Sequence, residues 1–266
     1  MTDPPPRASG VTLLEVRRLR LVEAVAPPVP SEERLAMDRA WCEAVQANPS
    51  LFDGPVVACA GLAREGPHGL VVTWVRTTYR RYALRRVPGA TSCLPSLFVS
   101  VLQPTADGRV LVGRMSSSTA APGRWQLPGG SVEPPPVHEP LDVAALSRHA
   151  ARELGEETGV EVPAEDLTLW CLTRGANGNV GVQFLAPSRP APLLCERFTA
   201  LLSAETARGN DPELDRLALL RSEADLTALG GTHVEYLEPV IHRYFGPWGQ
   251  GAVPGRSTRT TEDRQS

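Results

Sequence analysis

The chain has 266 residues, 42% of them hydrophobic, and a formal net charge of −3. That length allows one large domain or two small ones with a buried core. The near balance of charge argues against a protein that binds nucleic acid or acidic membranes through its overall field. Neither a signal peptide nor a membrane-length apolar segment is visible, so the sequence predicts a cytoplasmic location without membrane contact.

The five cysteines are scattered along the chain and form no C-x-x-C pair. This spacing indicates neither a disulfide framework nor a zinc site. Both ends, residues 1–10 and 248–266, are poor in apolar residues and are predicted to be disordered tails.

The first part of the chain, residues 11–92, predicts an α+β extension. Residues 11–24 alternate as a strand, and a helix follows from Ser31, which can cap it, with Leu35, Trp41 and Val45 on its apolar side. Two β-rich runs, 55–63 and 69–86, complete this unit.

The second part, residues 93–247, alternates strands and helices in the manner of one α/β domain. Strands are predicted at 97–104 and 109–115, joined by the turn signal "TADG". A helix runs from after residue 140 to about Glu157. The elements that follow are strands at 167–174 and 180–186, a helix at 196–207, a strand at 214–220, and helices from Ser222 and over 233–245. Strands on both sides of one acidic helix predict a mixed α/β sandwich.

That acidic helix carries Glu153, Glu156 and Glu157 at positions i, i+3 and i+4, so the three side chains share one face. At about 100° per residue, they project roughly a quarter turn from the apolar stripe that ends at Leu154. A merely solvated face would lie opposite the stripe. Three adjacent carboxylates can remain ionised around a divalent cation, and oxygen ligands suit Mg²⁺ or Mn²⁺. The sequence therefore predicts metal-assisted chemistry on a phosphate or diphosphate.

Two stretches resemble the signature of the Nudix hydrolase family. "RELGEETGV", Arg152–Val160, matches every fixed position of its second half, R-E-U-x-E-E-x-G-U, where U is a bulky aliphatic residue. "GRWQLPGGSVE", Gly123–Glu133, is similar to the strand and glycine turn that open it. The resemblance implies a Nudix-type α/β/α sandwich with a mixed sheet, preceded by the N-terminal extension.

The sequence departs from the signature between these stretches. The arginine stands 22 positions after Gly130 rather than 14, so eight residues are extra. Counting from either end places Pro136 or Ala144 where the first glutamate of the signature belongs. Glu133 or Glu139 could replace it, and a proline-rich surface loop is an equally good interpretation of both.

The resemblance also implies roles for single residues. Glu153, Glu156 and Glu157 would bind Mg²⁺ or Mn²⁺, Arg152 would orient them, and the Gly130 region would add a backbone oxygen.

A general base is also needed, and the family often takes it from a later loop glutamate. Glu205 and Glu213 are the candidates. His149 is interpreted as a helix-surface partner of Glu153.

The implied reaction is hydrolysis of a nucleoside diphosphate linked to a group X. "NPSLFDGPVV", Asn48–Val57, resembles the segment ahead of the domain in the UDP-glucose and UDP-galactose diphosphatase branch, which predicts UMP and sugar 1-phosphate as products. The alternatives are ADP-ribose or dinucleotide pyrophosphatase activity and a non-catalytic nucleotide-sensing module.

The run Val75–Arg86 interleaves five arginines with two tyrosines. As a strand it could hold phosphates and stack a base. A solvated strand face is the favoured interpretation, and nucleic-acid processing is disfavoured by the net charge.

Overall fold

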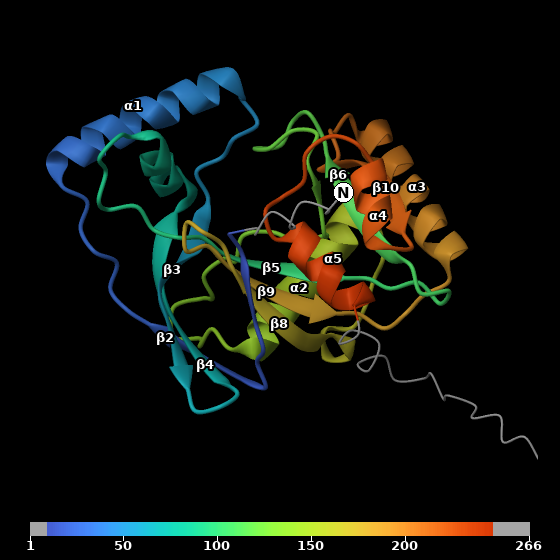
Figure 1. Ribbon diagram of the computed structural model, residues 1–266. Helices are drawn as coiled ribbons and strands as arrows, with labels where there is room; N and C mark the ends of the chain where they lie inside the picture. Colours follow the sequence, from blue (N-terminus) through green and yellow to red (C-terminus); the bar gives the residue numbers. More distant parts are fainter. Residues whose placement is uncertain (1–9, 247–266) are drawn as a thin grey trace, which may run out of the picture.

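The computed structural model describes residues 10–246 (Figure 1). The tails predicted at 1–10 and 248–266 therefore lie outside the described residues, except for Gly10. Within residues 10–246, no helix has the length and apolar character needed to span a bilayer.

The central sheet has four strands in the order β1-β8-β9-β5. Its pairs are antiparallel except β9 and β5, which run parallel, so the sheet is mixed as predicted. Every residue of β9 is buried, as expected for a strand covered on both faces. The strands are β1 (Thr12–Leu14), β5 (Leu97–Leu102), β8 (Thr168–Arg174) and β9 (Val180–Leu185).

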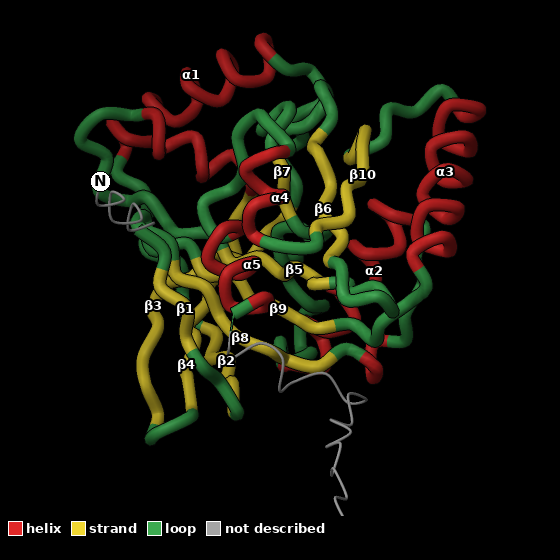
Figure 2. The backbone as a smooth tube through the Cα atoms, turned by 45° about the vertical axis from the view of Figure 1, so that its right-hand side comes forward, coloured by secondary structure: helices red, strands yellow, loops and turns green. Residues whose placement is uncertain are grey.

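Helices cover both faces of this sheet. Val99 and Val101 of β5 belong to the core cluster that contains Leu146 and Leu154 of one helix, whereas Phe98 packs in the cluster on the opposite face. The helices of this part are α2 (Val143–Thr158), η2 (Ala164–Asp166), α3 (Ala191–Arg208), α4 (Glu223–Ala228) and α5 (Leu237–Phe245). Since α2 and α5 lie on the two faces, the predicted α/β/α sandwich is confirmed (Figure 2).

A second, antiparallel sheet has the order β10-β6-β7. Its strands are β6 (Val110–Met115), β7 (Trp125–Gln126) and β10 (Leu214–Leu220). The predicted turn between β5 and β6 is present, and the Thr105 and Arg109 backbones bond across it at 2.8 Å. The two strands nevertheless enter different sheets, because β6 pairs with β10.

The N-terminal unit consists of a third sheet, ordered β2-β4-β3, and a helix that lies beyond one end of the sheet (Figure 1). Val57, Val72 and Trp74 of this sheet share the largest core cluster with Leu146 and Leu154 of α2. The unit therefore packs against the acidic helix. Its elements are β2 (Arg18–Glu23), α1 (Ser31–Ala47), β3 (Pro55–Glu65), β4 (Gly69–Thr78) and η1 (Tyr79–Arg86).

Several predicted boundaries in this unit are wrong. The single strand predicted at 11–24 is two strands, and the first of them joins the central sheet. Ser31 is the first residue of α1 rather than its cap, since Pro30 precedes the helix without a capping side chain. The helix buries Met37 and Ala44, whereas Leu35 is 62% exposed, because α1 packs only on the small cluster around η1.

The strand predicted over 69–86 ends at Thr78. Residues 79–86 form the 3-10 helix η1 instead, and Tyr79 donates its backbone N–H to the Gly54 carbonyl at 2.9 Å. The arginines of this run are therefore not spread over two strand faces. The last predicted helix is also shorter than expected, since α5 begins at Leu237 rather than at His233.

Candidate functional site

The acidic helix α2 is fixed at both ends. Asp142 caps it, accepting a hydrogen bond from the Ala145 N–H at 2.7 Å. Gly159 ends it with φ 71°, in the left-handed region, and a Cβ there would lie 2.7 Å from the Arg197 carbonyl of α3. The glycine of "RELGEETGV" is thus required by helix termination and by the close approach of α3. These constraints set the rotation of the glutamate face.

Glu157 is the buried member of that face. Only 4% of the residue is exposed, and its Oε2 accepts a hydrogen bond from the Gly129 N–H at 2.8 Å. The Gln126 amide approaches its Oε1 at 3.4 Å. Gly129 has φ 152°, and a Cβ there would lie 2.1 Å from the Val99 carbonyl, so only glycine brings this N–H to the carboxylate. Burial is the main reason that the pKa of Glu157 is raised well above its ordinary value.

Glu153 lies against the next glycine of the turn. Its side chain is 14% exposed, and a Cβ on Gly130 would lie 2.5 Å from its Oε2. Glu156 differs, because its side chain is 60% exposed. The shared helix face therefore contains one buried, one half-buried and one exposed carboxylate.

Glu213 joins this cluster from the residue before β10. Its carboxyl group lies close enough to that of Glu157 to form a side-chain hydrogen bond. The residue as a whole is exposed, yet partial burial of its carboxyl group, followed by the charges of Glu153 and Glu156, raises the pKa of Glu213. Its backbone carbonyl accepts from the Ser116 N–H at 2.8 Å, which anchors it to the end of β6.

Glu205, the other predicted base, is engaged elsewhere. Its carboxylate accepts hydrogen bonds from Asn210 at 2.9 Å and Arg208 at 2.7 Å, and these bonds, Asn210 first, lower the pKa of Glu205. Of the two candidates, the structure brings only Glu213 to the glutamate cluster.

Arg152 forms the basic edge of the cluster. Its Nη2 lies 2.9 Å from Glu133 Oε1 and 3.3 Å from Glu153 Oε1, and its Nη1 lies 4.0 Å from Glu156. Of the two acids that could replace the first signature glutamate, Glu133 contacts this arginine. The side chain of Glu139 forms no hydrogen bond or ion pair with any residue between 10 and 246.

His149 bridges Arg152 and Glu153. Its Nδ1 lies 3.0 Å from Arg152 Nη2, and its Nε2 lies 3.1 Å from Glu153 Oε1. The predicted partnership with Glu153 is confirmed, but the predicted surface position is wrong, since the imidazole is only 10% exposed. The contact orients the Glu153 carboxylate toward the glycine turn.

The N-terminal unit is bonded to loops around the cluster. Asn48 Nδ2 donates to the Ser118 and Thr119 carbonyls at 3.1 and 3.0 Å, in the loop that begins at Ser116. Arg76 Nη1 donates to the Pro135 carbonyl at 2.6 Å and so holds the proline-rich extra segment. These contacts, and that of Gln126 with Glu157, were not expected. Only the position of Gln126, directly before the glycine turn, hints at its contact.

The donor set of the cluster fits a hard divalent cation. All its side-chain groups are carboxylates, and after burial the charges of Glu213, Glu153 and Glu156 also raise the pKa of Glu157. As the side chains stand, no three Asp, Glu, His or Cys residues in the described part of the chain converge closely enough to hold an ion. Arg152 and His149 hold the Glu153 carboxylate in this arrangement.

Comparisons with known proteins identify the domain. The family model described as NUDIX domain matches residues 96–230. No curated protein matches the chain significantly.

Solved structures that resemble the chain carry related names. A MutT/nudix family protein from Enterococcus faecalis is 21% identical over 47% of this chain and 43% of its own, with a TM-score of 0.31. A MutT protein from Methanosarcina mazei Go1 is 21% identical over 56% of this chain and 93% of its own, with a TM-score of 0.37. A MutT NUDIX hydrolase from Burkholderia pseudomallei is 26% identical over 47% and 82%, with a TM-score of 0.31. Likenesses this low carry no information on substrate.

Proposed function

The chain belongs to the Nudix hydrolase family, and from this premise we propose that it is a metal-dependent diphosphatase of nucleotide sugars. The coarser activity, hydrolysis of a diphosphate in a nucleoside diphosphate derivative, follows the family. The proposed substrate is UDP-glucose or UDP-galactose, and the products are UMP and the sugar 1-phosphate. The cytoplasmic location expected from the sequence remains a prediction.

One observation carries the proposal: Glu157 and Glu153 lie against the Gly129–Gly130 turn, Glu213 lies beside Glu157, and Arg152 lies at their edge. Buried acids that repel one another destabilise a fold, and groups with pKa values perturbed in this way concentrate at functional sites. If the cluster had only a structural role, we would expect basic residues to neutralise its acids, as they do in the ion pairs elsewhere in this chain.

In the proposed mechanism, Glu153, Glu156 and Glu157 hold Mg²⁺ or Mn²⁺ together with a backbone oxygen of the Gly130 region. When bound, the ion polarises phosphoryl oxygens and neutralises charge on the leaving group. Arg152, supported by Glu133, keeps Glu153 and Glu156 in place.

Glu213 acts as the general base in this proposal. It accepts a proton from the water whose oxygen attacks one phosphorus atom, and the bond from that phosphorus to the bridging oxygen breaks. The bridging oxygen leaves with the bonding electrons on the other phosphate. A raised pKa brings a carboxylate base closer to the operating pH, which favours proton transfer.

The N-terminal unit supports the choice of substrate. The stretch Asn48–Val57 resembles the corresponding segment of the UDP-sugar branch, and Asn48 bonds to the loop that begins at Ser116, the residue hydrogen-bonded to Glu213. The Asn48 side chain thereby ties the start of this stretch to a loop beside the proposed base. We infer that this stretch contributes to recognition of the nucleotide sugar.

Product analysis tests the proposal. The purified chain is incubated with Mg²⁺ and either UDP-glucose or ADP-ribose, and the products are identified by phosphorus NMR, with a Glu157→Gln variant as control. We expect UMP and glucose 1-phosphate, absent in the variant. Hydrolysis of ADP-ribose but not of UDP-glucose would support the hydrolase activity and contradict the proposed nucleotide-sugar substrate. If neither compound is cleaved while nucleotide binds, the chain is a sensing module instead.

A further inference from the structure

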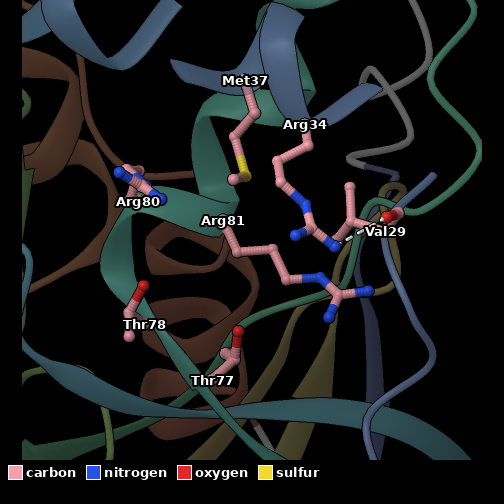
Figure 3. Close-up of a pocket in the computed structure, with 7 residues that line it drawn as sticks. All are labelled: Val29, Arg34, Met37, Thr77, Thr78, Arg80 and Arg81. Carbon is pink, nitrogen blue, oxygen red and sulfur yellow. Dashed lines mark hydrogen bonds between the residues drawn. The ribbon is translucent and has the colours of Figure 1, made fainter. Parts of the chain in front are cut away.

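The N-terminal unit contains a second charged hollow, of about 300 Å³, between α1 and the junction of β4 with η1 (Figure 3). This volume is at the small end of ligand pockets, which begin at about 300 Å³. None of its lining residues belongs to the glutamate cluster. The hollow is lined by Val29, Arg34, Met37, Thr77, Thr78, Arg80 and Arg81.

Arg81 is a buried cation without an acidic hydrogen-bond partner. The residue is only 7% exposed, and its guanidinium donates to carbonyl oxygens alone: to Pro27 at 2.9 Å and to Ser92 at 3.2 and 3.3 Å. Carbonyl oxygens satisfy N–H groups but leave the charge uncompensated. Removing a charge from water is costly unless it is paired.

Arg34, an exposed residue of α1, brings a second guanidinium group to the hollow. Its Nη2 donates to the Val29 carbonyl at 3.3 Å, and within residues 10–246 it has no ion pair. In Figure 3 the Arg34 and Arg81 side chains extend toward the same side of the hollow, whereas Arg80 points the other way. Two guanidinium groups of like charge thus line one space.

The acids nearby are engaged with other groups. Asp38 and Asp53 pair with Arg80 at 3.4 and 4.0 Å. The charge of Glu33 acts on Arg81 at a distance, but the Glu33 carboxylate accepts its hydrogen bonds from Thr91 and Ser92, at 2.9 to 3.0 Å. These bonds, the one from the Thr91 backbone first, lower the pKa of Glu33 to about 2. Glu33 therefore offsets part of the Arg81 charge, although it neither lines the hollow nor forms an ion pair with Arg81.

The remaining lining residues complete a site for an anion. The Thr77 and Thr78 hydroxyls form no hydrogen bond with another residue of the described chain. Met37 is buried and supplies an apolar wall. Arginine forks with adjacent hydroxyl donors match the several acceptor oxygens of a phosphate group.

We propose that this hollow binds a phosphate group, as the free ion or as a nucleoside monophosphate, at a site separate from the glutamate cluster. Arg34 and Arg81 supply the charge, and Thr77 supplies a hydroxyl donor. The proposal does not depend on the activity, because binding is measured without turnover.

The test is calorimetric titration of the full chain with inorganic phosphate, in EDTA and at low salt so that no metal draws phosphate to the glutamate cluster. We expect one saturable site. Arg34→Gln should weaken binding about tenfold, the loss of one charged contact. Arg39→Gln is the matched control: it makes the same charge change in α1 at an exposed residue outside the hollow, and it should leave the Kd within about twofold.

Further measurements keep the result interpretable. Arg81→Lys removes a buried guanidinium group, so the fold of this variant is checked by circular dichroism. In the wild-type chain, the NMR signals of the Arg34 and Arg81 side-chain N–H groups should shift on titration with phosphate. UMP replaces phosphate in a parallel series, and tighter binding of UMP with the same Arg34 dependence would identify a nucleotide as the source. Absence of saturation up to about 20 mM phosphate, or equal weakening in Arg34→Gln and Arg39→Gln, would overturn the proposal.

Discussion

The chain contains two runs of like charge that the fold treats differently. In Val75–Arg86 most arginines find partners: Arg76 pairs with Glu23 at 2.7 Å, Arg80 with Asp38 at 3.4 Å, and Arg85 donates to Asn179 at 3.0 Å. In Arg152–Val160 three acids share one helix face with a single arginine, and Glu157 lies close to a fourth acid, Glu213.

We infer from this difference that the arginine run is structural and that the acidic run serves the proposed site. Arg76 and Arg80 pair with acids of the N-terminal unit, whereas the buried Arg81 donates to carbonyl oxygens alone, in the hollow described above. Among the acids, Glu157 is buried and Glu153 is largely buried, which costs free energy, and a fold retains such a cost where the charge serves a ligand. A run of like charges in a sequence therefore indicates a functional site only when the contacts of its side chains are known.

The largest expected effect concerns the fourth acid. Glu213→Gln should lower kcat by about 10²- to 10⁴-fold with little change in KM, because a lost general base affects the transition state rather than substrate binding. The acid limb of the pH profile should also disappear, since the base must be deprotonated and its pKa is raised. Steady-state kinetics from pH 5 to 9 measure both.

Glu205→Gln provides the matched comparison for this variant. Glu205 is bound by Arg208 and Asn210, so its replacement should leave kcat within about twofold. A larger loss in Glu205→Gln than in Glu213→Gln would reverse the assignment.

A smaller effect is expected at the edge of the cluster. Glu133→Gln removes the ion pair that holds Arg152 at 2.9 Å, and loss of a supporting partner of metal ligands typically costs about 10- to 100-fold in metal affinity or activity. Titration with Mg²⁺ should restore much of the rate. Glu139→Gln changes the same charge in the same loop and should behave as wild type.

The sequence predicted the parts of this site that depend on local spacing. The acidic helix, predicted from after residue 140 to about Glu157, its glutamate face and the glycine turn follow from periodicity and glycine chemistry, and the structure has each of them. Local signals also located most strands, because burial imposes alternation along a single element.

What the sequence did not predict depends on contacts between distant segments. Glu213 and Glu205 are equivalent in sequence, and only the pairing of β10 with β6 places Glu213 beside Glu157. The choice between Glu133 and Glu139 depends on the path of a proline-rich loop. The end of β4 at Thr78 depends on the bond between Tyr79 and Gly54, contributed by another segment. The alternation of residues over 79–86 is compatible with a strand, so the sequence pattern alone cannot predict that β4 ends at Thr78.

The cost of the acid cluster can be measured directly. Glu157→Gln should stabilise the metal-free chain by about 1–2 kcal/mol at pH 7, within the range of substitutions that relieve a functional site. Since the folded-state pKa of Glu157 lies above the ordinary value of 4.5, the unfolded chain releases this proton first, and stability falls as pH rises from about 4.5. Denaturation in EDTA should show a difference that grows with pH above 4.5 and vanishes below it. A destabilised variant at pH 7 would show that the cluster is not strained.

The smallest effect is expected in the arginine run. Arg76 and Glu23 are about one-third and one-half exposed, so their coupling in a double-mutant cycle should stay below about 1 kcal/mol. Arg76→Gln alone should cost more than Glu23→Gln, because Arg76 also holds the Pro135 carbonyl and lies over the Trp74 ring at 5.4 Å. Urea denaturation of the wild type, the two single variants and the double variant, in low and in high salt, measures the coupling free energy. A coupling above about 2 kcal/mol would mean that charge is as costly here as in the acid cluster, and the two runs would no longer be distinguished by their energetics.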